Sequence, residues 1–118
     1  MDEKNGFPPE PDTPLTLDET NFEAALTTYN VLVVDFWAPW CMPCRMVAPA
    51  VETLAKKMKG QAAFGKVNVD EAGNLAARFN VMSIPTLIIF SKGAKVGELV
   101  GAMPPQVMEN KILAALKT

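Results

Sequence analysis

The sequence contains no histidine and only two cysteines among its 118 residues. Without histidine the chain lacks the commonest general base and the commonest transition-metal ligand, so every triad that needs imidazole is excluded. Two cysteines are too few for a small fold stapled by several disulfides, and they supply only half of a four-ligand zinc site. We therefore expect no metal site, and any chemistry has to come from other groups.

The chain also lacks a strong excess of one charge and a long apolar run. Its 11 Lys and Arg residues and 13 Asp and Glu residues give a net charge of −2, which offers no electrostatic basis for binding nucleic acid or an anionic membrane. The longest uncharged stretch, between Arg78 and Lys92, is too short to span a bilayer. The first residues, 1–5, are polar and do not resemble a secretory signal. We therefore expect a soluble, cytoplasmic protein.

Residues 1–14 contain four of the ten prolines, set among acidic neighbours. Such a segment has little to bury, and its composition favours extended, solvated backbone. We interpret residues 1–14 as a disordered N-terminal tail, with a docking motif as the alternative. One ordered domain is expected over residues 15–118, because a chain of this size and apolar content can bury a single core.

Apolar patterning predicts an α/β fold. The residues from Val31 to Trp37 are β-branched and aromatic with almost no alternation, which is typical of a strand covered on both faces. Further strands are expected at 64–69, 86–90 and 96–100. Helical spacing follows a capping box of the form Thr20-x-x-Glu23 and recurs over 47–58, over 75–79 and in a last stripe at Met108, Ile112, Leu113 and Leu116. The order β-α-β-α-β-α-β-β-α predicts a central mixed sheet of five strands flanked on both faces by four helices.

Both cysteines lie where the first long strand ends and a helix begins, in Trp40-Cys41-Met42-Pro43-Cys44. At the helix N-terminus, unpaired backbone N–H groups and the helix dipole would lower the pKa of the Cys41 thiol. A decrease from about 8.5 to about 7 would raise the thiolate fraction at pH 7 from about 3% to about half. Cys44, one turn later, would face inward and fits a resolving thiol. We interpret the pair as a redox dithiol; the alternatives are zinc ligation, a structural disulfide and two core cysteines without chemistry.

Asp35 is the single charged residue of the strand 31–37. A carboxylate is disfavoured in an apolar strand, and burial should raise its pKa. From the residues alone, a chemical role and a structural role stay equally open. The structural role would be that of a hydrogen-bonded acid or of a local strand irregularity.

The segment from Asp35 to Arg45 resembles the active-site segment of the thioredoxin family. This resemblance implies the thioredoxin fold and a protein disulfide reductase that carries electrons through its cysteine pair. It departs from the family at Met42, where glycine is most frequent, and this affects the expected redox potential rather than the reaction. The resemblance covers most of the chain from Leu15 onward, through Pro49, 66–70, 84–86, Gly93 and 100–102.

The resemblance also implies the roles of individual residues. Asp35 would lie beneath the cysteines and accept the Cys44 proton through water, with Lys66 nearby to modulate it. The Ile84–Pro85 bond would be cis, so that the Ile84 backbone faces the Cys41 sulfur and can pair with an extended substrate segment. An exposed apolar rim around the disulfide would contact substrates, formed by Trp40, Met42, Pro43, Met82, Ile84, Pro85 and the turn Val100-Gly101-Ala102-Met103.

The same resemblance implies partners and leaves two alternative functions open. Thioredoxin reductase would reduce the cysteine pair, and ribonucleotide reductase, peroxiredoxins and methionine sulfoxide reductases would receive the electrons. No metal or organic cofactor is needed within the chain, which we expect to act as a monomer. One alternative is a thiol oxidant or disulfide isomerase, although those families usually place histidine between the cysteines. The other is a non-redox binding module with the thioredoxin fold.

Overall fold

The computed structural model describes residues 6–117, and in this part of the chain it has five strands and four helices. Their order confirms the predicted sequence of elements. The bounds are β1 (Leu15–Leu17), α1 (Phe22–Thr28), β2 (Val31–Trp37), α2 (Met42–Lys57), β3 (Ala63–Asn68), α3 (Gly73–Arg78), β4 (Thr86–Ser91), β5 (Ala94–Val100) and α4 (Pro105–Leu116).

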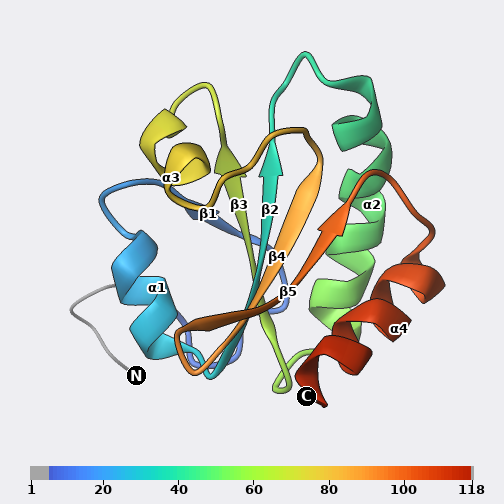
Figure 1. Ribbon diagram of the computed structural model, residues 1–118. Coiled ribbons are helices and arrows are strands. Elements are labelled where there is room, and N and C mark those ends of the chain that lie inside the picture. The colour runs from blue at the N-terminus through green and yellow to red at the C-terminus, as the bar shows by residue number, and fades with distance from the viewer. Residues whose placement is uncertain (1–5, 118) are drawn as a thin grey trace.

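The strands form one mixed sheet in the order β1-β3-β2-β4-β5. The central strand β2 runs parallel to β3 and antiparallel to β4. Helices α1 and α3 cover one face of the sheet, and α2 and α4 cover the other (Figure 1). The predicted mixed sheet with helices on both faces is therefore confirmed. Within residues 6–117, no helix is long and apolar enough to cross a membrane.

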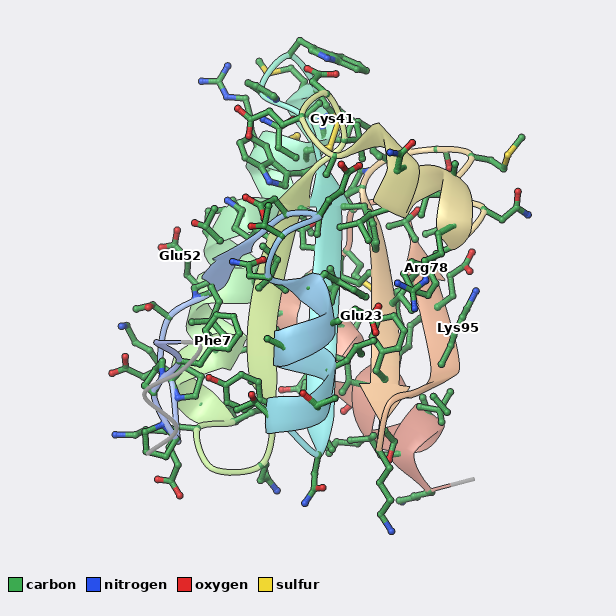
Figure 2. All side chains as sticks on the ribbon, turned by 90° about the vertical axis from the view of Figure 1, so that its left-hand side faces the viewer. Phe7, Glu23, Cys41, Glu52, Arg78 and Lys95 are labelled. Atoms are coloured by element: carbon green, nitrogen blue, oxygen red, sulfur yellow. A yellow bond between two sulfur atoms is a disulfide. The ribbon has the colours of Figure 1, made fainter. Side chains whose placement is uncertain are left out.

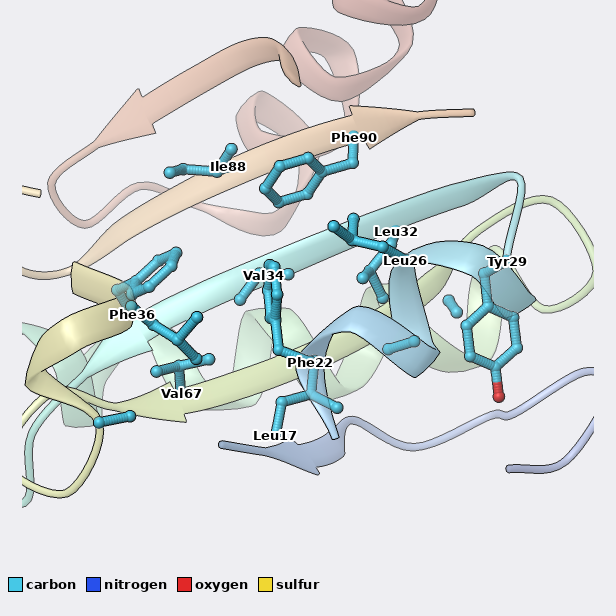
Figure 3. Close-up of a cluster of buried hydrophobic side chains, with 14 of the residues drawn as sticks. Leu17, Phe22, Leu26, Tyr29, Leu32, Val34, Phe36, Val67, Ile88 and Phe90 are labelled. Carbon is cyan, nitrogen blue, oxygen red and sulfur yellow. The ribbon is translucent and has the colours of Figure 1, made fainter. Parts of the chain in front are cut away.

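The two faces of β2 belong to two separate hydrophobic clusters. Leu32, Val34 and Phe36 pack beneath α1 in the cluster drawn in Figure 3, where Tyr29 and Phe36 lie at opposite ends. Val33 points the other way and packs against residues of α2 and α4. This two-sided burial is the physical reason for the nearly continuous apolar sequence of the strand.

The described part of the N-terminal segment packs against the domain. Phe7 is only 7% exposed, and its ring lies 6.0 Å from the ring of Tyr29, centroid to centroid. The Tyr29 hydroxyl donates a hydrogen bond of 2.6 Å to the Pro8 carbonyl. The sequence predicts nothing to bury here, but one aromatic side chain on this bent, proline-rich backbone suffices to reach the core. The first five residues of the predicted tail lie outside the described residues.

Two smaller predictions are wrong. The capping box at Thr20 and Glu23 does not form, because α1 begins after Asn21 and the Thr20 hydroxyl donates to Asp18 at 2.6 Å instead. The Asn21 side-chain oxygen accepts the Asp18 N–H at 2.8 Å, so local side-chain bonds shift the start of the helix. Leu113, predicted to face inward on α4, is exposed, whereas Met108 and Ile112 are buried.

Candidate active site

Cys41 is the N-cap residue of α2, and a disulfide joins it to Cys44 across a Cα–Cα distance of 5.3 Å. The backbone N–H of Cys44 donates to the Cys41 sulfur at 3.2 Å. This N–H is one of those that a helix leaves unpaired at its N-terminus, so it would also stabilise a thiolate there. The predicted placement of Cys41 at the helix N-terminus is confirmed.

The local sequence explains why the helix begins here. Strand β2 ends at Trp37, and the Cys41 N–H bonds back to the Ala38 carbonyl at 3.1 Å, which closes a turn. Pro43 occupies the first turn of α2, where its missing N–H costs nothing and its fixed φ suits a helix. The turn and the proline thus place one cysteine before the helix and the other in its first turn. Cys41 is 5% exposed and Cys44 2%.

Asp35 is buried in β2 and is 1% exposed. Among the described residues, neither of its carboxylate oxygens has a hydrogen-bond partner. Burial raises its pKa from 3.8 to about 7, and the nearby Lys66 charge partly opposes this shift. Asp35 pairs in register with Lys66 on β3 and with Leu87 on β4, without a strand irregularity. A local strand irregularity therefore does not describe this residue.

Lys66 is half-buried on β3, beside Asp35. Its ammonium group lies 4.5 Å from the centroid of the Trp37 ring, within cation–π distance. The Lys66 charge partly limits the rise in the Asp35 pKa.

The Ile84–Pro85 peptide bond is cis, as the resemblance implied. The Ile84 carbonyl oxygen lies 3.8 Å from the Cys41 sulfur, so this backbone faces the disulfide. Two bonds hold the loop: the Thr86 hydroxyl donates to Ser83 O at 2.6 Å, and the Gly101 N–H donates to Pro85 O at 2.8 Å. The second bond brings the turn after β5 against the same loop.

Most of the predicted rim residues surround this loop and the disulfide. Trp40, Met82 and Ile84 line one groove of about 270 Å³, together with Val69, Ala76, Val81 and Ser83. Met42, Pro43 and Ala102 are exposed, and Gly101 is half-buried.

Pro85 is buried, so it does not belong to the exposed rim. Its backbone carbonyl instead anchors Gly101.

Sequence reasoning missed two residues beside the rim. Met46 is exposed one helical turn after Met42, a relation that the i, i+4 spacing could have revealed. Asp70 accepts the Trp40 indole N–H at 3.0 Å and so orients this exposed ring. Nothing in the local sequence connects Asp70 with Trp40, because the two residues come from different loops.

The sequence profile of the thioredoxin family matches residues 13–114 of the chain. The chain belongs to the thioredoxin family.

Known thioredoxins agree with this assignment. The chain is 40% identical over 103 residues to thioredoxin of Alicyclobacillus acidocaldarius subsp. acidocaldarius, and this alignment covers 87% of the chain and 98% of that protein. It is 47% identical over 81 residues to chloroplastic thioredoxin M4 of Arabidopsis thaliana, and this alignment covers 69% of the chain and 42% of that protein. Among solved structures, a thioredoxin variant from Halobacterium salinarum NRC-1 aligns with a TM-score of 0.83 and 37% identity, covering 89% of this chain and 92% of that one.

These findings confirm the predicted thioredoxin fold and the predicted reaction class. The protein is a thiol–disulfide oxidoreductase whose dithiol, Cys41 and Cys44, reduces disulfides.

Proposed function

We propose that Cys41 attacks the target disulfide and Cys44 resolves the product. The observation that carries this assignment is the N-cap position of Cys41, whose sulfur receives the Cys44 N–H at 3.2 Å. In the first step the Cys41 thiolate bonds to one target sulfur, and the other target sulfur leaves as a thiolate. In the second step Cys44 attacks the Cys41 sulfur and releases the second target thiol. Two electrons pass to the target, and the Cys41–Cys44 disulfide remains.

Asp35 is the group we assign to receive the Cys44 proton, through water, during resolution. Its pKa of about 7 suits a base that works near neutral pH, where both protonation states are populated. Lys66, opposite Asp35 on β3, keeps that pKa from rising further. We expect Asp35→Asn to slow resolution of the mixed disulfide while alkylation of Cys41 proceeds. Unchanged steady-state disulfide reduction by this variant would refute the role.

Substrate binding is assigned to the loop and groove beside the disulfide. An extended target segment would pair with the Ile84 backbone, which lies next to the Cys41 sulfur. Main-chain pairing fixes geometry without demanding one target sequence. The apolar side chains of the rim would add contact area, namely those of Trp40, Met42, Pro43, Met82, Ile84 and Ala102, with Gly101 supplying close backbone approach.

Partners and location follow from the family and are likewise proposals. The electron donor is a thioredoxin reductase, and the recipients are disulfide-containing proteins such as ribonucleotide reductase, peroxiredoxins and methionine sulfoxide reductases. We propose that the protein acts as a monomer in the cytoplasm; the name of the Arabidopsis relative places that protein in the chloroplast.

An insulin reduction assay with dithiothreitol tests the mechanism. The protein should accelerate precipitation of the insulin B chain, and Cys41→Ser should lower the rate to that of dithiothreitol alone. Cys44→Ser should instead accumulate a mixed disulfide with insulin that is visible on a non-reducing gel. Full activity of Cys41→Ser would overturn the assignment.

Two further measurements separate the alternatives. If a redox titration settles near the potential of disulfide-forming enzymes, the thiol oxidant or isomerase replaces the reductase. If a variant with both cysteines changed to serine retains its biological activity, the protein is a binding module.

A further inference from the structure

Five of the six described methionines fall into two groups of opposite exposure. Met42, Met46 and Met82 are 64%, 73% and 86% exposed, whereas Met58 and Met108 are 1% and 0% exposed. A sixth methionine, Met103, packs partly buried against the core. Exposed methionines are unusual because the side chain is apolar and is more often buried.

The three exposed methionines lie on two segments next to the disulfide. Met42 follows Cys41 directly, and Met46 is one turn further along the same face of α2. Met82 lines the groove that it shares with Trp40 and Ile84. The Ile84 carbonyl, 3.8 Å from the Cys41 sulfur, connects this groove to the disulfide. Two of the three methionines thus belong to the surface that we assign to substrates, and the third adjoins it.

We propose that Met42, Met46 and Met82 are sites of reversible oxidation by peroxides and that their sulfoxides weaken substrate binding. The second part of this proposal depends on the substrate-binding role assigned above. In the reaction with hydrogen peroxide the thioether sulfur bonds to one peroxide oxygen, the O–O bond breaks, and water leaves after proton transfer. The sulfur loses two electrons and the peroxide gains them.

The disulfide makes these methionines the vulnerable groups. When Cys41 and Cys44 are joined, neither can supply the thiolate that peroxides attack most readily. The thioethers with the greatest access to solvent then react first. Each oxidation turns a flexible apolar side chain into a polar one, so a target that buries it has to desolvate the sulfoxide oxygen. Oxidising conditions would therefore convert more of this protein to its disulfide form and also lower its affinity for its targets.

Peptide mapping tests the first half of the proposal. The disulfide form is treated with hydrogen peroxide, digested with trypsin and analysed by tandem mass spectrometry over time. Methionines 42, 46 and 82 should gain oxygen at least about tenfold faster than 58 and 108, which act as internal controls. Comparable rates at the two groups would overturn the proposal.

Kinetics test the second half. After peroxide is removed and dithiothreitol has reduced the disulfide, KM for insulin should be about fivefold higher than in untreated protein, with kcat changed less than about twofold. Methionine sulfoxide reductases should restore KM. The triple leucine variant (Met42→Leu, Met46→Leu and Met82→Leu) should show the same KM before and after peroxide, whatever its starting value.

Three results would contradict the proposal: an unchanged KM after full oxidation, an equal rise in the leucine variant, or no recovery with the reductases. If untreated protein fails to reduce insulin at all, the proposed function fails instead, and peptide mapping still decides whether the sites exist.

Discussion

At the Cys41 end of the sheet the protein exposes apolar side chains and buries a carboxylate that has no hydrogen-bond partner within residues 6–117. The Phe7 end instead buries an aromatic ring and pairs the adjacent tyrosine hydroxyl (Figure 2). Pro9, Glu10 and Pro11 lie at this second end beside the residues that precede β2 and β3. The contrast indicates that one end of the sheet serves the chemistry and the other serves stability. Features that reduce stability gather where chemistry occurs, and the opposite end contributes packing and satisfied polar groups that offset them.

The largest effect is expected from Asp35. Its pKa of about 7 in the folded protein exceeds its ordinary value of 3.8, so the native state keeps the proton over a pH range in which the unfolded state has lost it. The free energy of unfolding should be highest below about pH 4, fall as the pH rises through about 7, and then level off. The total decrease is about 4 kcal/mol.

Asp35→Asn should remove this pH dependence and make the disulfide form more stable than the wild type by a few kcal/mol at about pH 8. Urea unfolding at several pH values measures the free energy of unfolding of both proteins, with Glu52→Gln, a change at an exposed residue, as the control. The same pH dependence in both Asp35→Asn and the wild type would show that the cost does not arise at this carboxylate.

The next largest effect is expected at the opposite end of the sheet. Phe7→Ala removes a ring that is 7% exposed within the core cluster, so the free energy of unfolding should fall by about 3 kcal/mol. The rate of insulin reduction should not change, because the ring lies far from the disulfide (Figure 2). Pro9→Ala, an exposed change in the same segment, is the matched control. A loss in the free energy of unfolding below about 0.5 kcal/mol would show that burial of the Phe7 ring does not stabilise this end of the sheet.

Tyr29→Phe should produce a smaller loss of about 1 kcal/mol, the usual value for one neutral hydrogen bond. Burial raises the pKa of the Tyr29 hydroxyl, so ultraviolet titration of the wild type should also show ionisation above the ordinary value of 10.0. The double variant with Phe7→Ala should be less destabilised than the sum of the two single changes, because the rings are in contact. Strict additivity would mean that the two residues stabilise this end independently.

The smallest effect is expected from Asp70→Ala at the reactive end. This change frees the Trp40 indole N–H, so KM for insulin should rise about twofold to threefold while the free energy of unfolding stays within about 0.5 kcal/mol. Glu71→Ala, an exposed neighbouring carboxylate, should change neither quantity. An equal effect of the two substitutions would point to net charge rather than to the orientation of Trp40.

The sequence predicts the sheet and the cysteine pair well because their signals are local. The apolar run from Val31 to Trp37 reports two-sided burial directly, and Cys41 stands between a strand pattern and a helix pattern. Contacts between distant segments are not encoded in this way. Phe7 stands in a proline-rich stretch that is typical of disorder, and only the fold brings it to Tyr29. The bond between Trp40 and Asp70 likewise depends on how two loops meet.

The buried carboxylate lies between these cases. Sequence places Asp35 in an apolar strand and therefore predicts a raised pKa, which the structure confirms. It does not reveal that both carboxylate oxygens lack a partner among the described residues, since that depends on the neighbouring strands.

Alkylation rates test the central claim most directly. The reduced protein is treated with iodoacetamide over a range of pH, and modification of each cysteine is followed by mass spectrometry. Cys41 should react faster than Cys44, and its rate should rise through a pKa well below the ordinary thiol value of about 8.5. Faster reaction at Cys44, or a Cys41 that titrates like a free thiol, would contradict the account.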